Sequence, residues 1–516
     1  MQISAERMLL LGVIVAGICL RFTSLESKAY WYDEAFTSLE VSGYSPQEAS
    51  MDILTGRVVA ASDLEKYQFP QTASPKTVTN TVKGIIANEP QLTPLYFIVL
   101  RYWSEVFRNS IAALRVLSAL FSVAALGFAF WLCRELFQSS RVAWICVALM
   151  AVSPLHFLYA QEARPYSMWS ATILLSSAVL LRALRQKTTS SWLLYALCTA
   201  LSLYTYLLAV LVVLGHVLYV LFEERFRLTR TVVAFGLSAA VGVAAFLPWP
   251  YRGQRSGAGN EAYSLIRYAM KWVRSIGIVF VDFNFRDYTP KHLLIPYAIV
   301  LVALVLLSGY SVYFLWRNAS RRQAAFVLTL AGTVCLSLSA LDLITGSSRA
   351  LVTRYLFPSL VGLQIALAYL LATRTSDSSL WRNRTPWRWG LGFVLTLGLA
   401  SCVMIVRADV WWNKDPENYV QSASRLINQA NNPLVVSDAW FVQVLSLEHE
   451  LRPGVRYQLT VEPAVPDLRD DASTLFAFRP SAHLRGELGK RFFMERVDGP
   501  ADLWRLSRKT DGHGGA

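Results

Sequence analysis

Two adjacent carboxylates, Asp33 and Glu34, lie in an aromatic stretch of the sequence that runs from Tyr30 to Phe36 (YWYDEAF). The stretch directly follows the first apolar segment, so we expect it where the chain leaves a membrane. Trp and Tyr are common at that level, whereas Asp and Glu there need water, a partner or a chemical task. We therefore interpret Asp33 as a catalytic base and Glu34 as its neighbour in the site. An ordinary solvated loop acid is the alternative.

A short polar turn between two apolar segments carries a second group of candidates. It contains Gln161, Glu162, Arg164 and Tyr166. If the preceding helix continued into the turn, Tyr159 and Glu162 would share one face and line one wall of a site, although Pro165 interrupts such a helix. We interpret Glu162 as a further catalytic carboxylate and its neighbours as substrate-binding residues. The alternative is a structural ion pair between Glu162 and Arg164.

Arginines near the start of a late apolar segment form the third group. Arg349 and Arg354 lie on the side of the membrane where basic residues are rare, and Tyr355 follows directly. A guanidinium keeps its charge and can donate two parallel hydrogen bonds, which suits a phosphate. Arg115, at the start of the second apolar segment, is a weaker candidate of the same kind. Snorkelling of these side chains to lipid headgroups is the alternative.

Hydrophobic residues make up 54% of the 516 residues. Long uncharged runs recur up to about residue 406, and each approaches the roughly 20 residues that a membrane helix needs. We therefore expect a polytopic α-helical membrane protein. The net charge of +14 comes mostly from Lys and Arg in short loops, so it indicates orientation and lipid contact and no nucleic-acid binding. The six cysteines lie in apolar segments, without the spacing of a metal site.

The apolar segments predict about eleven membrane spans. They lie at about 8–22, 111–133, 142–160, 167–182, 192–206, 207–222, 231–248, 293–315, 324–344, 355–373 and 389–406. Basic residues gather in alternate loops, which places the N-terminus in the cytoplasm and the C-terminal tail outside the inner membrane. The candidate residues then share the outer face. The region 192–222 is either one long broken hairpin or two short helices.

A change in composition after Arg407 predicts two domains. Residues 1–406 would form the membrane module, and its first outer loop, 23–108, would carry amphipathic helices. Residues 407–516 would form a small soluble α/β domain with a helix over 417–430, a buried strand over 433–437 and a disordered end. The loop at 249–292 is rich in aromatic and basic residues, and we expect it to help choose the acceptor.

These candidates together suggest one reaction, the transfer of a sugar from a lipid phosphate to a hydroxyl group. The acceptor hydroxyl needs a general base, for which Asp33 is suited. The departing phosphate needs positive charge, which Arg354 and Arg164 can supply as the bond breaks. A helical bundle can provide the groove that the isoprenoid tail of such a carrier requires.

Several short motifs occur in the order seen in one group of membrane enzymes. They are Asp33-Glu34, Pro94-Leu95-Tyr96, Leu114-Arg115, Ser153-Pro154, Gln161-Glu162-Ala163-Arg164 and Leu203-Tyr204-Thr205-Tyr206. Over roughly residues 1–370 the chain resembles the GT-C superfamily of membrane glycosyltransferases. Within it the chain is most similar to family 39 and the aminoarabinose transferases of lipid A, kin of the protein O-mannosyltransferases. The resemblance implies a polyprenyl-phosphate sugar donor, inversion at the anomeric carbon, and Asp33 as the base that activates the acceptor.

Two departures from the family pattern concern metal binding. Family members often have His-Pro-Pro where this chain has EPQLTP at 89–94, and commonly Tyr-Thr-His where it has Tyr204-Thr205-Tyr206. We therefore assign no metal ligand and no cofactor, although some GT-C enzymes use a divalent ion. The expected partners are the donor, membrane lipids, and an acceptor that is a lipid, a glycan or a protein.

Two functions of other classes remain open from the sequence. A transporter or flippase for a lipid-linked saccharide would share the apolar bundle and the outward arginines, but it would favour polar residues near the bilayer midplane and an inverted repeat. His156 and His216 are the main polar exceptions within the spans. A catalytically inactive scaffold is the second alternative, and the Asp33-Glu34 pair and the Gln161–Arg164 turn argue against it.

Overall fold

The computed structural model describes residues 5–70, 75–107, 110–249, 265–285, 289–376, 384–417, 419–468 and 474–509. The chain folds into two compact units. The helical unit consists of Met1–Thr23, Pro90–Tyr96 and Arg115–Arg407, and the sheet unit of Ser24–Glu89, Phe97–Leu114 and Ala408–Ala516. The first loop therefore groups with the C-terminal segment in one compact unit.

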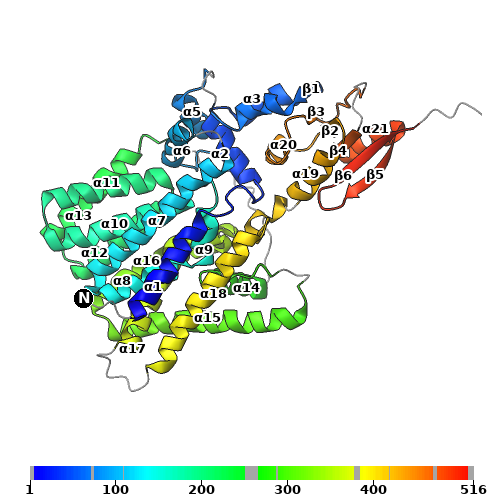
Figure 1. Cartoon of the computed structure of the whole chain (residues 1–516). Coiled ribbons are helices and arrows are strands. Elements are labelled where there is room, and N and C mark those ends of the chain that lie inside the picture. Colours follow the sequence, from blue (N-terminus) through cyan, green and yellow to red (C-terminus); the bar gives the residue numbers. More distant parts are fainter. Residues whose placement is uncertain are drawn as a thin grey trace, which may run out of the picture. The chain divides into compact units, whose positions relative to one another are not determined.

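Every apolar segment expected to cross the membrane is helical. The helices are α1 (Ala5–Arg21), α7 (Ile111–Phe137), α8 (Ser140–Ala151), α9 (Pro154–Ala160), α10 (Tyr166–Gln186), α11 (Thr189–Thr205), α12 (Ala209–Glu223), α13 (Arg230–Phe246), α15 (Lys291–Asn318), α16 (Arg321–Thr345), α17 (Phe357–Thr375) and α18 (Thr385–Arg407), with the shorter α14 (Leu265–Gly277) between α13 and α15. Within this unit α1 packs beside α8 and α18, and α11 packs against both α10 and α13 (Figure 1).

The chain is a multi-pass membrane protein. Among the described residues, six helices are long and apolar enough to cross a bilayer, or seven if the bent pair α8 and α9 forms one span. Two further helices in the described part of the chain, α12 and α13, are apolar but shorter. The count of eleven spans therefore stays a prediction.

Two breaks in the helices have local causes. The segment expected as one span over 142–160 bends by 60° between α8 and α9, where Pro154 starts α9 and Ser153 donates its hydroxyl to the carbonyl of Val279, 2.6 Å away. In the region 192–222 the structure has two helices, because Tyr206 adopts an extended backbone (φ −160°) at the end of α11.

Three buried polar side chains in the helical unit, Arg21, His216 and His156, make hydrogen bonds to neighbouring helices. The Arg21 guanidinium, fully buried, donates to the hydroxyl of Ser122 on α7 and to the carbonyl of Met150 on α8, both at 3.0 Å. His216 lies between the hydroxyls of Tyr195 and Ser177, at 3.0 and 3.1 Å. His156 contacts the Gln364 amide oxygen at 2.9 Å. These contacts satisfy polar groups that would be costly in an apolar core, so they suit a structural role.

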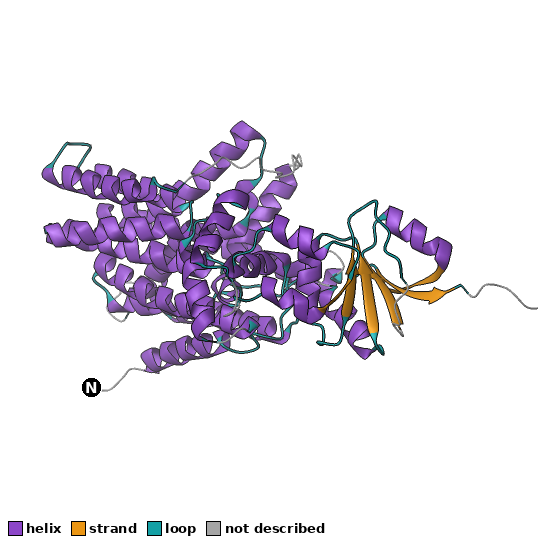
Figure 2. Cartoon of the chain, turned by 90° about the horizontal axis from the view of Figure 1, so that it is seen from above, coloured by secondary structure: helices purple, strands orange, loops and turns teal. Residues whose placement is uncertain are grey.

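The sheet unit contains one six-stranded sheet in the order β1-β3-β2-β4-β6-β5. The strands are β1 (Val58–Ala60), β2 (Pro433–Ser437), β3 (Arg456–Leu459), β4 (Thr474–Phe478), β5 (Phe492–Asp498) and β6 (Leu503–Arg508). The central strands β3, β2 and β4 run parallel, and the other pairings are antiparallel. The sheet is drawn in orange in Figure 2. The buried strand expected over 433–437 is confirmed, whereas the pairing of β1, from the first loop, with β3 was not expected.

Helices of the same unit come from both ends of the sequence. They are α2 (Tyr32–Ser42), α3 (Pro46–Ile53), α4 (Ala61–Leu64), α5 (Val78–Asn88), α6 (Leu95–Val106, which begins at the border of the units), α19 (Val420–Gln429), α20 (Phe441–Glu448) and α21 (Ala482–Arg491). The helix expected over 417–430 is therefore shorter, as α19. One core cluster packs Leu434 and Val436 of β2 against Leu484 and Leu488 of α21. Of the end expected to be disordered, 509–516, residues 510–516 lie outside the described residues, as do 250–264 and 286–288 of the loop expected to help choose the acceptor.

Candidate active site

An aromatic cluster in the helical unit surrounds the polar turn. It comprises Tyr159, Tyr166, Trp169, Tyr206, Tyr355 and Phe357. The ring centroids of Tyr159 and Tyr166 are 5.0 Å apart, and those of Trp169 and Tyr206 are 4.5 Å apart. Edge-on and tilted contacts at these distances are favourable for aromatic rings. The cluster joins segments that are up to about two hundred residues apart in the sequence.

Arg354 lies against this aromatic cluster. Its guanidinium carbon is 5.6 Å from the ring centroid of Tyr166 and 5.9 Å from that of Tyr355, distances at which a cation is attracted to a ring face. The side chain is half-buried, in the short 3₁₀ helix η3 (Thr353–Leu356) that leads into α17. The structure thus brings together Tyr166 from the polar turn with Arg354 and Tyr355, as substrate binding by all three would require.

The helix before the polar turn does not continue into the turn. α9 stops at Ala160 and α10 starts at Tyr166 after Pro165, so Tyr159 and Glu162 do not share one continuous helix face. Pro165 disfavours the α conformation in Arg164, the residue before it, so a helix cannot run through the turn into α10. Tyr159 and Tyr166 nevertheless meet, because the turn folds back on itself.

The turn residues are buried and engage their neighbours. The Gln161 side-chain amide donates to the carbonyl of Thr23 at 2.9 Å and to those of Leu20 and Arg21 at 3.4 Å, so it caps the C-terminal end of α1. Glu162 is fully buried and Arg164 is 5% exposed. These contacts give Gln161 a structural role in addition to the substrate-binding role that we expected.

The two other arginines differ in their surroundings. Arg115 is fully buried on α7, one turn before Ser118, whose hydroxyl contacts the Arg164 carbonyl at 3.4 Å. Arg115 therefore lies on the α7 face nearest the turn. The backbone N–H of Arg349 donates to the Asp342 carboxylate at 2.9 Å, and its side chain is half-buried.

Asp33 and Glu34 belong to the sheet unit, where they start a helix and not a loop. Both lie in the first turn of α2. Negative charge is stabilised there, because the backbone N–H groups at a helix N-terminus point outward. Asp33 is half-buried, while its neighbour Glu34 is completely buried. The two adjacent carboxylates thus have different environments, which suits different roles.

Glu34 forms a buried ion pair with a residue that sequence reasoning did not connect to it. The Lys414 ammonium donates to Glu34 at 2.7 Å and to the carbonyl of Ala29 at 3.0 Å. The side chains of Glu34 and Lys414 are 0% and 4% exposed. Lys414 follows the last apolar segment by only a few residues, and 380 positions separate it from Glu34. No local pattern could therefore have predicted this pair.

Aromatic rings flank Asp33 on α2. Tyr32 and Phe36 both contact Trp440, with ring centroids 6.3 and 5.2 Å apart. Among the described residues, no group of three or more His, Cys, Asp or Glu side chains has the geometry to hold a metal ion. The chemistry available at α2 is therefore that of a half-exposed carboxylate beside aromatic surfaces.

Residues 89–251 match the family described as dolichyl-phosphate-mannose-protein mannosyltransferase. A search of curated proteins gives no match. The archaeal oligosaccharyltransferase AglB from Archaeoglobus fulgidus aligns at 12% identity over 87% of this chain and 64% of that chain, with a TM-score of 0.45 that is too low to bear on the fold.

Two solved structures match over nearly the full length. The crystal structure of ArnT from Cupriavidus metallidurans in the apo state aligns at 13% identity with a TM-score of 0.54 and covers 98% of each chain. The same protein bound to undecaprenyl phosphate aligns at 13% identity with a TM-score of 0.53 and covers 99% of this chain and 100% of that one. The resemblance expected from the short motifs is confirmed: the chain has the ArnT-like fold of the GT-C membrane glycosyltransferases.

Proposed function

We propose that this protein is an inverting glycosyltransferase that moves a sugar from a polyprenyl-phosphate donor to an acceptor hydroxyl at the outer face of the inner membrane. The observation that carries the proposal is the position of Arg354 against Tyr166 and Tyr355 in the helical unit. A guanidinium held beside aromatic rings offers charge for a phosphate and apolar surface for the first isoprene units. The similar fold of ArnT, which was crystallised with undecaprenyl phosphate, supports this class of donor.

In the proposed reaction Asp33 accepts the proton of the acceptor hydroxyl. The freed oxygen attacks the anomeric carbon, and the bond between that carbon and the donor phosphate oxygen breaks. The electron pair leaves with the polyprenyl phosphate, whose growing charge Arg354 and Arg164 stabilise, with Arg115 and Arg349 as further cations. Attack from the face opposite the leaving group inverts the anomeric carbon. Tyr166, Tyr355 and Gln161 would line the donor site, with Glu162 as a further carboxylate there.

Glu34 would position the base. The buried pair with Lys414 fixes the first turn of α2, and the base is part of that turn. A buried carboxylate paired at 2.7 Å with an ammonium is poorly placed to exchange protons with a substrate. We therefore propose Asp33 as the proton acceptor and the Glu34–Lys414 pair as its support.

Transfer and transport can be separated in one experiment. The full chain is reconstituted in liposomes with a polyprenyl-phosphate sugar that carries a label in the sugar, and an envelope extract supplies acceptors. The proposal predicts label in a new product and an equal amount of released polyprenyl phosphate. Liposomes without protein give the background. Movement of intact donor across the bilayer with no bond broken would contradict the proposal and support a flippase.

A further inference from the structure

A groove of about 430 Å³ opens in the sheet unit at the carboxyl ends of two parallel strands. Ser437 of β2 and Leu459 of β3 are partners in the sheet, so the residues that follow them, Asp438 and Thr460, lie at the same edge and line the groove. Ligands of open α/β sheets bind at this edge, because the loops after the strands leave a crevice there. The volume lies within the range of about 300–1,000 Å³ that is usual for small-molecule sites.

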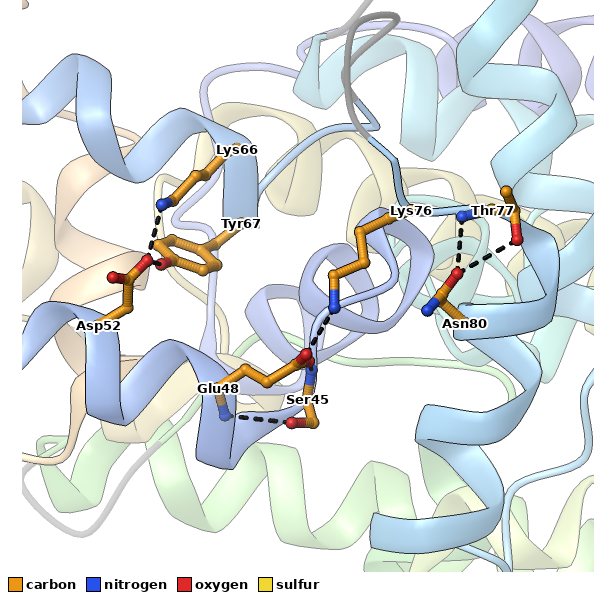
Figure 3. Close-up of polar contacts among 8 residues, drawn as sticks. All are labelled: Ser45, Glu48, Asp52, Lys66, Tyr67, Lys76, Thr77 and Asn80. Atoms are coloured by element: carbon orange, nitrogen blue, oxygen red, sulfur yellow. Dashed lines mark hydrogen bonds and ion pairs between the residues drawn. The ribbon is translucent and has the colours of Figure 1, made fainter.

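The opposite wall of the groove is α3, which ion pairs hold in place. Glu48 accepts hydrogen bonds from Lys76 at 2.5 Å and from the backbone of Ser45 at 2.8 Å, and one turn later Asp52 accepts from Lys66 at 2.7 Å and from Tyr67 (Figure 3). Hydrogen bonds from the lysines lower the pKa of Glu48 and Asp52, so both carboxylates remain ionised and paired. Gln47, Ser50 and Met51 of α3 line the groove.

Trp440 connects the groove to the helix that carries Asp33. One side of its indole contacts Phe36 and Tyr32 of α2, yet 51% of the residue is exposed and lines the groove. Trp440 shares the groove lining with the exposed side chains of Met51 and Val461, and a contiguous exposed apolar patch marks an interaction site. A molecule seated in the groove would therefore reach across Trp440 toward the first turn of α2.

We propose that this groove binds the saccharide part of the acceptor, so that the acceptor is a glycan or glycolipid. The inference rests on the proposed function and names its acceptor class. Sugar rings present C–H faces that pack on an indole, and hydroxyls that hydrogen-bond to carboxylate, amide and hydroxyl groups. Trp440 and Met51 supply the apolar surfaces, and Asp438, Gln47 and Ser50 the polar groups. A saccharide held on Trp440 would extend a hydroxyl toward Asp33.

Two other occupants fit less well. Asp438 is the one charged side chain among the described residues that line the groove, and a carboxylate repels the donor phosphate or a sulfated ligand. An extended peptide acceptor would pair with an exposed strand edge, but the lining comes from the ends of β2 and β3 and from α3, and from neither edge strand. A neutral or amino-substituted saccharide is the occupant that these residues favour.

The test uses the full chain in nanodiscs, applied to an array of bacterial glycans that also carries Ser/Thr-rich peptides. Wild-type protein should bind a subset of the glycans. Trp440→Ala should weaken that binding about tenfold or more, and Trp440→Phe should recover part of it. Gln47→Ala, at an exposed position that leaves the fold intact, should weaken it about two- to tenfold. Phe493→Ala, which removes an exposed aromatic ring from β5 at the sheet edge, is the matched control and should bind normally.

Undecaprenyl phosphate binding, measured on the same preparations, separates this inference from the proposed function. The inference expects Trp440→Ala to bind undecaprenyl phosphate as the wild type does. Glycan binding that depends on Trp440 in a protein without transferase activity would uphold the groove and refute the proposed function. Three results would overturn the inference. They are a wild type that binds no glycan, Trp440→Ala and Gln47→Ala variants that bind glycans as tightly as the wild type does, and binding confined to the peptides.

Discussion

Arg354 and Arg374 stand at the two ends of one helical segment, and both guanidinium groups lie over aromatic rings. Arg354 faces Tyr166 and Tyr355, whereas Arg374 faces Phe314 at 4.8 Å and donates to the hydroxyl of Tyr310. The two residues are thus alike in chemistry. Only Arg354 lies beside the polar turn that holds Glu162 and Arg164, which is why we assign it to the donor phosphate.

This assignment predicts a specific loss of donor binding. Arg354→Ala should weaken the affinity for the donor by roughly ten- to a hundredfold and also lower kcat, because a charge-assisted hydrogen bond is lost. Arg354→Lys should recover only part, since a point charge does not replace a planar fork. Arg374→Ala is the matched control and should bind donor normally. Equal donor affinity in all four proteins, measured by titration, would remove Arg354 from the site.

At the scale of elements, the first turn of α2 depends on a lysine from the C-terminal segment. Removing one partner of a buried ion pair leaves the other charge uncompensated, which costs about 3–5 kcal/mol. Lys414→Met should therefore lower the thermal midpoint and reduce kcat by displacing Asp33. The double variant Glu34→Gln with Lys414→Met should recover most of the stability, because no lone charge remains. Thermal unfolding and kcat of the single and double variants test this coupling.

The activity of the double variant distinguishes a positioning role of Glu34 from a catalytic role. If Glu34 positions Asp33, the double variant should regain activity together with stability. A double variant that is as stable as the wild type but inactive would make Glu34 a catalytic residue, as one interpretation of the sequence had it.

The positions of the helices could be predicted from the sequence, whereas the contacts between distant segments could not. Apolar runs of membrane length locate helices such as α7, α10 and α16, because a bilayer imposes that length on the chain. The three-residue strand β1 has too few residues to show periodicity, and its partner β3 lies almost four hundred residues later. The Glu34–Lys414 pair could not be predicted either, because 380 positions separate its two residues. Tyr166 and Arg354 were each recognised as candidates, but only the fold shows that they meet.

At the scale of the whole molecule, the proposed chemistry requires that the sheet unit face the outside. Cysteines introduced at exposed positions can test this, after Cys19, which is exposed, is replaced by Ser. Gln47→Cys and Glu495→Cys, in the sheet unit, should react with an impermeant thiol reagent once the outer barrier is opened. Gln138→Cys and Leu228→Cys, in loops rich in Arg, should react only after the inner membrane is lysed. Labelling of Gln47→Cys only after lysis would place Asp33 in the cytoplasm.

The central claim is that Asp33 activates an acceptor for sugar transfer from a lipid phosphate, and one comparison tests it most directly. The rate of transfer from a labelled polyprenyl-phosphate sugar is measured for the purified wild type and for Asp33→Asn, with donor affinity measured on the same samples. The account predicts that Asp33→Asn keeps its donor affinity and loses roughly a hundredfold or more in kcat, because the amide cannot accept the proton. An Asp33→Asn protein with near-normal kcat at saturating donor and acceptor would contradict it.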